Sequence, residues 1–184
     1  MPRILEIILA SLGLIVLVPL ILVLVVAVRY DSPGPGIFRQ TRIGRYGHCF
    51  ECYKLRTMAI ETPHVPTHDA RPGDLTRIGS FLRNAKLDEL PQLFNVLVGE
   101  MSFVPRPSLE SQTALIAERE MRGVLNIRPG ITGMAQIRGI DMSDPILLAE
   151  VDADYMANRS FALDVEILFR TVFGGAGRGD RIGR

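Results

Sequence analysis

The chain has 184 residues with 21 Lys and Arg against 20 Asp and Glu, and 47% of its residues are apolar. A chain this apolar is not disordered as a whole, and its formal charge of +1 excludes wholesale wrapping of nucleic acid. Its two cysteines cannot form a disulfide framework, so we expect a reduced, intracellular domain that buries a core without cross-links.

The first segment of the chain is strongly apolar and predicts a membrane-embedded helix. No charged residue occurs from Ile7 to Val28, and at about 1.5 Å per residue this run is long enough to cross a bilayer core of about 30 Å. Pro19, near its middle, removes a backbone donor and kinks or breaks the helix. Two geometries follow: a kinked helix that spans the bilayer, which the residues alone favour, and a helix that enters one leaflet and returns.

The remaining residues predict a compact domain of the α/β class that is rich in helices and has short strands. A turn-forming stretch, Asp31-Ser-Pro-Gly-Pro-Gly36, leads out of the apolar segment. Residues 59–74 contain three prolines and no apolar period, so we expect a surface loop. The expected strands are 37–43 and 50–58, and the expected helices are 76–85, 109–122, 145–157 and 163–173, with one more between Asp88 and Gly99.

The last of these helices is amphipathic. Its apolar residues surround a narrow polar stripe of Asp164, Glu166 and Arg170. This pattern fits an interfacial helix on a membrane surface and, equally, an ordinary core helix.

A cysteine pair and a histidine pair have nearly the spacing of a zinc finger. They are Cys49-x-x-Cys52 and His64-x-x-x-His68. Pro63 and Pro66 forbid the regular helix that carries both histidines in such a finger. We therefore interpret the segment as a strand with two small half-buried thiols beside a polar loop, and a zinc-dependent nucleic-acid module stays a distant alternative.

Two adjacent carboxylates, Asp88 and Glu89, stand where the helix that ends at Gly99 is expected to start. Asp88 has the position of an N-cap, and Pro91 is tolerated in the first turn. Because a helix N-terminus attracts anions, this pair with a divalent cation and the upstream Arg83 can hold phosphate, and an ionised Asp88 can attack phosphorus. The same fragment also fits a capping aspartate followed by an exposed glutamate, which the residues alone favour.

Two rigid loops each carry an arginine that can clamp phosphate. Arg106 lies between two prolines, and Arg128 opens the motif Arg128-Pro-Gly-Ile-Thr-Gly133. For Arg106, a rigid loop with a plain surface arginine is the commoner case.

Six motifs stand in order along the chain and are far more specific together than alone. They are Asp31-Ser-Pro-Gly-Pro-Gly36, Phe38-Arg-Gln-Thr-Arg-Ile-Gly44, Tyr53-Lys-Leu-Arg-Thr-Met58, Leu87-Asp-Glu-Leu-Pro-Gln-Leu-Phe-Asn-Val-Leu97, Gly99-Glu-Met-Ser-Phe-Val104 and Arg128-Pro-Gly-Ile-Thr-Gly133. In this order they resemble the bacterial sugar transferase family, the monotopic polyprenyl-phosphate phosphoglycosyl transferases of the small-domain type. The resemblance extends from the apolar segment to about Phe173.

This resemblance implies a membrane-inserted helix over residues 1–30, re-entrant and broken at Pro19, and a catalytic domain over residues 31–184 on the cytoplasmic face of the bacterial inner membrane. It implies that Asp88 attacks the sugar-bearing phosphorus of a nucleoside diphosphate sugar, with UMP leaving a UDP-sugar. The phosphosugar then passes to polyprenyl phosphate. The product, a polyprenyl diphosphate sugar, starts exopolysaccharide, O-antigen or glycoconjugate synthesis.

By resemblance, Asp88 is the catalytic nucleophile and a ligand of the required Mg²⁺, and Glu89 assists catalysis as a second ligand of the metal or in proton handling. Lys54, Arg83 and Arg106 match family cations near the phosphates, and Arg128 lies in a motif linked to nucleotide binding. The implied partners are the nucleotide sugar, polyprenyl phosphate and the lipid bilayer, without nucleic acid, while the sugar and any homo-oligomer stay open. A catalytically inactive, membrane-anchored interaction protein is the alternative.

The chain departs from the family pattern at three places. Val18 stands where the family usually has a serine, whose hydroxyl helps satisfy the backbone broken by the proline. Val104-Pro-Arg-Pro107 replaces the usual Gly-Pro-Arg-Pro with one residue fewer, and Met134 replaces a common tryptophan.

Overall fold

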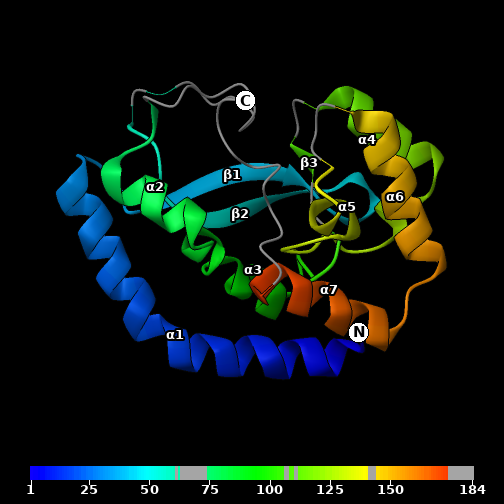
Figure 1. Ribbon diagram of the computed structural model, residues 1–184, viewed down its shortest axis with the longest axis horizontal. Coiled ribbons are helices and arrows are strands. Elements are labelled where there is room, and N and C mark those ends of the chain that lie inside the picture. Colours follow the sequence, from blue (N-terminus) through cyan, green and yellow to red (C-terminus); the bar gives the residue numbers. More distant parts are fainter. Residues whose placement is uncertain (61, 63–73, 106–107, 110–111, 141–143, 174–184) are drawn as a thin grey trace.

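Helix α1 (Arg3–Asp31) is a 29-residue apolar helix that bends near its middle and runs along one side of the molecule (Figure 1). Pro19 lies inside it and explains the bend, because proline lacks the N–H of the helical ladder and its ring clashes with the preceding turn. In the described part of the chain, α1 alone is long and apolar enough to cross a membrane. The computed structural model describes residues 1–60, 62, 74–105, 108–109, 112–140 and 144–173.

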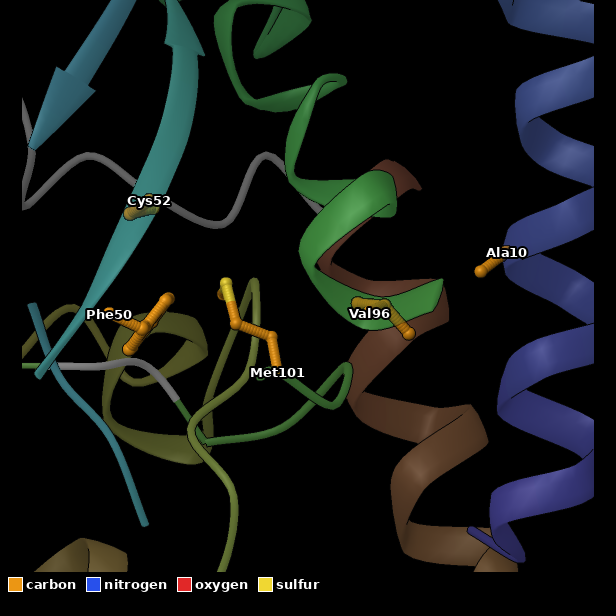
Figure 2. Close-up of a cluster of buried hydrophobic side chains, with 5 residues drawn as sticks. All are labelled: Ala10, Phe50, Cys52, Val96 and Met101. Carbon is orange, nitrogen blue, oxygen red and sulfur yellow. The ribbon is translucent and has the colours of Figure 1, made fainter. Parts of the chain in front are cut away.

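Both ends of α1 contact the same folded domain. In its first half, Ala10 is fully buried and lies in one core cluster with Val96 of helix α3 (Gln92–Val98) (Figure 2). At its other end, Val28 packs with Leu55 and Leu82 in a second cluster. Much of the helix surface between these contacts exposes large apolar side chains to the outside: Leu12, Ile15, Val16, Val18, Leu20, Leu22 and Val23.

A small antiparallel sheet forms the centre of the domain. Strand β1 (Ile37–Ile43) pairs with β2 (Cys49–Leu55), and its other edge pairs with the two-residue β3 (Ser108–Leu109), in the order β2-β1-β3. The expected strand 37–43 is confirmed. The expected strand 50–58 ends earlier, because β1 begins at Ile37 and offers no strand partner beyond it.

The two cysteines lie on opposite faces of β2. Cys49 is exposed, whereas Cys52 is buried in the core cluster with Phe50 and Met101 (Figure 2). Side chains alternate along a strand, so residues three apart point to opposite sides. The expectation of two half-buried thiols is therefore wrong, and the pair is not placed to hold one metal ion. His64 and His68 lie outside the described residues.

The helices surround this sheet. In Figure 1, α2 and α3 lie between the sheet and α1, and α4 and α6 pack together at the far end. Helix α6 coincides with the expected range 145–157, and Asp144 caps it by accepting the Leu147 N–H at 3.0 Å. The helical elements are α2 (Arg77–Asn84), α4 (Thr113–Met121), α5 (Met134–Ile137), α6 (Pro145–Ala157) and α7 (Phe161–Phe173), with 3-10 turns η1 (Arg45–Gly47), η4 (Leu87–Glu89) and η5 (Val124–Asn126).

Helix α7 has both a core side and an exposed apolar side. Asp164, expected in an exposed polar stripe, is buried and accepts the Tyr155 hydroxyl at 2.5 Å. Burial and this hydrogen bond raise the pKa of Tyr155. Ile167 lies in the core, while Phe169 and Phe173 are exposed. The core-helix interpretation therefore holds for the buried side, and the membrane-surface interpretation stays a prediction for the exposed side.

Asp31, the last residue of α1, connects that helix to α2. Its Oδ2 accepts the Ile78 N–H at 3.0 Å, and Thr76 accepts the Gly79 N–H at 2.9 Å, so two side chains cap the first turn of α2. The Ile78 hydrogen bond, with help from Thr76 and the nearby Arg77, lowers the pKa of Asp31. The turn-forming exit from α1 thus fixes the start of α2.

Because of this cap, the stability of the protein is expected to vary with pH in the acid range. The folded-state pKa of Asp31 lies below its ordinary 3.8, so its contribution is complete above about pH 4 and is lost as the pH falls through the folded-state pKa. We expect Asp31→Asn to lower the apparent Tm in detergent by about 2–4 °C at neutral pH, and the difference to shrink toward about pH 3. Thermal scans at one fixed rate measure both. A difference that stays constant with pH would contradict the electrostatic explanation.

Candidate active site

Asp88 and Glu89 lie in η4, a 3-10 turn between α2 and α3. Lys86, just before it, has a φ of 55°, a left-handed conformation that non-glycine residues rarely adopt outside functional or tightly held turns. Pro91 occupies the N-cap position of α3, so the expected capping role of Asp88 is wrong. Because Pro91 has no N–H to continue an α-helix from Leu87, the chain closes as a 3-10 turn instead.

The end of β2 brings a lysine to this carboxylate pair. Lys54 Nζ lies 3.1 Å from Glu89 Oε1, and the two side chains are only 16% and 12% exposed. Lys54 has the same strand parity as Cys52, which faces the core. Asp88 is buried at 7% exposure. The structure therefore confines a lysine and two carboxylates to one half-buried corner.

Arg83, on α2, is held against the segment that follows β2. Its Nε donates to Thr57 Oγ1 at 2.9 Å, and Thr57 is itself buried. Helix α2 comes this close because Gly79 has no side chain: a Cβ there would lie 2.0 Å from the Thr57 carbonyl oxygen. Since η4 packs against both α2 and β2, the Asp88 turn joins the elements that carry Arg83 and Lys54.

Asn95 holds α3 against the sheet, a role that was not predicted from the sequence. Fully buried, it accepts the Tyr53 N–H at 3.1 Å and donates through Nδ2 to the Glu51 carbonyl and the Glu100 carboxylate, both at 2.7 Å. It thereby satisfies backbone groups on the outer edge of β2, next to Lys54 in the strand. An amide within the otherwise apolar run 93–98 was the signal that pointed to it.

Arg128 lies at the other end of α3. Its Nε donates to the Gly99 carbonyl at 2.9 Å, and Gly99, at a φ of 96°, ends α3 as expected. Seven helical residues separate Gly99 from Pro91, a rise of about 10 Å. The structure therefore places Arg128 away from Asp88.

Arg106 lies outside the described residues, but the segment leading to it is firmly placed. Thr132 N donates to the Phe103 carbonyl at 2.9 Å. A Cβ on Gly130 would lie 2.1 Å from the Val104 nitrogen, so glycine is needed for this backbone contact. The 128–133 motif thus supports the chain just before Arg106.

The donor set at the corner fits magnesium. Within the described ranges, no cluster of three or more His, Cys, Asp or Glu side chains is placed to hold an ion. Mg²⁺ is commonly held by one or two carboxylates, with waters and substrate phosphates completing its shell. Adjacent Asp88 and Glu89 provide such a pair.

The sequence is similar to those of a described family and of several known proteins. The sequence profile described as bacterial sugar transferase matches residues 1–177. The chain is 39% identical over 180 residues to a UDP-glucose:undecaprenyl-phosphate glucose-1-phosphate transferase of Caulobacter vibrioides, covering 92% of this chain and 67% of that protein.

Two further relatives are longer. A protein of the same description from Klebsiella pneumoniae is 40% identical, over 94% of this chain and 39% of its own length. The UDP-N-acetylgalactosamine-undecaprenyl-phosphate N-acetylgalactosaminephosphotransferase of Aeromonas hydrophila is 38% identical, over 84% of this chain and 38% of its own length. The chain thus spans about two fifths of these two relatives. By its matching profile and these identities, the chain belongs to the bacterial sugar transferase family.

Proposed function

We propose that this chain transfers a sugar 1-phosphate from a nucleoside diphosphate sugar to a polyprenyl phosphate. The observation that carries the proposal is the half-buried corner where Asp88 and the Lys54–Glu89 ion pair meet. Relatives at about 40% identity are named for transfer of sugar phosphates from UDP-sugars to undecaprenyl phosphate. Those names favour a UDP-sugar as donor and an undecaprenyl-type lipid as acceptor.

The proposed reaction has two displacements at one phosphorus. A carboxylate oxygen of Asp88 attacks the sugar-bearing phosphorus, the bond to the bridging oxygen breaks, and UMP leaves. A phosphate oxygen of the polyprenyl phosphate then attacks the same phosphorus. The aspartyl–phosphorus bond breaks, which releases polyprenyl diphosphate sugar and restores the Asp88 carboxylate.

The surrounding side chains position and neutralise charge. Lys54 and Arg83 lie on the two elements that flank η4 and are the cations proposed to receive the diphosphate oxygens. Burial of Asp88 keeps water from competing with the acceptor lipid. Mg²⁺, held by Asp88 and Glu89, would supply further charge neutralisation when bound. Arg106 and Arg128 are also proposed to contact the phosphates or the nucleotide. Arg128 would do so from the end of α3 that is opposite Asp88.

We further propose that α1 enters one leaflet and returns. A spanning helix places its ends on opposite sides of a core of about 30 Å, whereas both ends of α1 contact one domain. The bend visible in Figure 1 supports the same geometry. The domain then rests on one face of the bilayer, which the family resemblance implies is cytoplasmic.

Helix α7 supports this orientation. Figure 1 shows it beside the N-terminal half of α1, and the Met1 nitrogen contacts Asp164 of α7. The exposed Phe169 and Phe173 are suited to the lipid interface beside α1.

The test of function uses the detergent-solubilised protein with Mg²⁺ and a panel of UDP-sugars, without acceptor. We expect release of UMP and an intact-mass increase equal to one phosphosugar. Addition of polyprenyl phosphate should discharge the adduct and yield the lipid product. Folded protein that gives neither adduct nor lipid product with any donor would favour the inactive, membrane-anchored interaction protein.

Thr57 is expected to act on donor binding through Arg83. Thr57→Val keeps the side-chain shape but removes the oxygen that accepts from Arg83 Nε. Loss of one hydrogen bond to a charged group should raise KM for the UDP-sugar by about tenfold, with a smaller effect on kcat. Initial rates measure both constants, and Thr57→Ser should restore KM. An equal rise in KM in the Thr57→Val and Thr57→Ser variants would contradict this role.

A further inference from the structure

The first turn of α1 carries an arginine that caps the end of another helix. The Arg3 guanidinium donates to the carbonyls of Val96 at 2.5 Å, and of Leu97 and Met101 at 3.3 Å. Carbonyls in the last turn of a helix have no partner within that helix, and a cation there also suits the helix dipole. Arg3 therefore ties the beginning of α1 to the C-terminal end of α3.

A buried carboxylate completes this contact. Glu6 is 5% exposed, and its oxygens accept from Arg3 Nη1 at 3.0 Å and from Ser102 Oγ at 2.5 Å. A carboxylate in a strongly apolar helix is costly in lipid, and its hydrogen bonds are satisfied only while this face of α1 lies on the domain.

Small residues continue the same helical face. Residues 6, 10 and 13 follow the i, i+4, i+7 spacing. Ala10 is fully buried, and a Cβ on Gly13 would lie 3.2 Å from Leu93 Cδ1 of α3. Small side chains allow two helices to approach closely. We name Arg3, Glu6, Ala10 and Gly13 the α1–α3 seam.

We propose that the α1–α3 seam fixes the N-terminus on the same side of the bilayer as the catalytic domain. The proposal rests on the proposed re-entrant geometry. Pro19 deprives one helix carbonyl of its backbone donor, and Val18 has no hydroxyl to offer in exchange. The restraint on α1 therefore comes from its first half, through polar contacts that form only on the domain. Arg3 and Glu6 are positioning residues. They hold the C-terminal end of α3, and the turn that carries Asp88 lies just before the N-terminal end of the same helix.

The test reads the side of the membrane directly. Pro2→Cys supplies a thiol at the N-terminus, in a Cys49→Ser background that removes the exposed native thiol. Cells expressing the full chain are converted to spheroplasts and treated with a membrane-impermeant maleimide, before and after permeabilisation. Two variants break the seam: Arg3→Ala with Glu6→Ala, which leaves the net charge unchanged, and Gly13→Leu, which leaves every charge in place. Val16→Leu, on an exposed part of α1, is the matched control.

We expect the thiol to be protected in intact spheroplasts with the native seam and in the control. Labelling from outside should rise about tenfold in both seam variants. The loss of charged hydrogen bonds, or of close packing, raises the fraction of chains whose N-terminus lies outside. Protection of both variants until permeabilisation would overturn the proposal. Outside labelling with the native seam would overturn it together with the re-entrant geometry, and the UDP-sugar adduct assay on the same protein shows separately whether the proposed function stands.

Discussion

Asp88→Asn is expected to abolish the phosphosugar adduct and to lower turnover at least about a thousandfold, the scale on which removing a nucleophile acts. Asparagine keeps the shape of the side chain in its buried site, but its amide oxygen does not form the phosphorus bond. The measurement combines intact mass after incubation with a UDP-sugar and the rate of UMP release. The variant should still fold and associate with membranes.

Two matched variants sharpen this test. Asp154→Asn removes an exposed carboxylate elsewhere in the domain and should leave turnover unchanged. Glu89→Gln retains the Asp88 nucleophile but removes the charge opposite Lys54, so an adduct should still form, more slowly. Full turnover by Asp88→Asn would refute the nucleophile assignment and leave the rest of the corner to be explained otherwise.

Asn95→Ala should have the largest effect on stability. It leaves the Tyr53 N–H and the Glu51 carbonyl of β2 without their buried partner, at a cost of about 1–3 kcal/mol for each group. For a chain of this size, we expect a fall in apparent Tm of about 5–15 °C, measured in detergent at a fixed scan rate. Adduct formation should fall as well, because Lys54 and Glu89 lose their alignment.

The amide itself, rather than its volume, is the cause. Asn95→Asp keeps an acceptor for Tyr53 but sets a carboxylate beside Glu100, so it should destabilise at least as much at neutral pH. Asn158→Ala removes an exposed amide that bonds within one helix end, and its Tm should stay close to the original value. An unchanged Tm for Asn95→Ala would show that the clamp is dispensable.

Elements with local signals were predictable from the sequence. Helix α6 matches its expected range because Asp144 and Pro145 carry both the cap and the first helical position. Thr76 caps α2, and Gly99 ends α3, as their residue types indicate. In each case the decisive contact lies within a few residues along the chain.

Contacts between distant segments were not predictable in this way. Lys54 and Glu89 are 35 residues apart, and their pairing depends on how Asn95 sets α3 against β2. The resemblance placed Lys54 near the phosphates and Glu89 at the metal, but said nothing of this clamp. Arg128 shows the reverse: its motif suggested the nucleotide, whereas its side chain reaches the Gly99 carbonyl at the far end of α3.

Local patterns misled where two rules competed. Asp88 has the residue type of an N-cap, yet Pro91 three positions later displaces the start of the helix. The spacing of Cys49 and Cys52 suits a metal site in a turn, but on a strand it sends the thiols to opposite faces.

The α1–α3 seam also has a consequence for biosynthesis. Arg3 is translated well before its acceptor, because Val96 is made 93 residues later, an interval of several seconds at about 5–20 residues per second. In the proposed membrane insertion, α1 would meet lipid during that interval with only Pro19 and its own apolar surface to shape it. The proposed re-entrant helix would therefore enter the membrane before the part of the domain that secures its first turn has been translated.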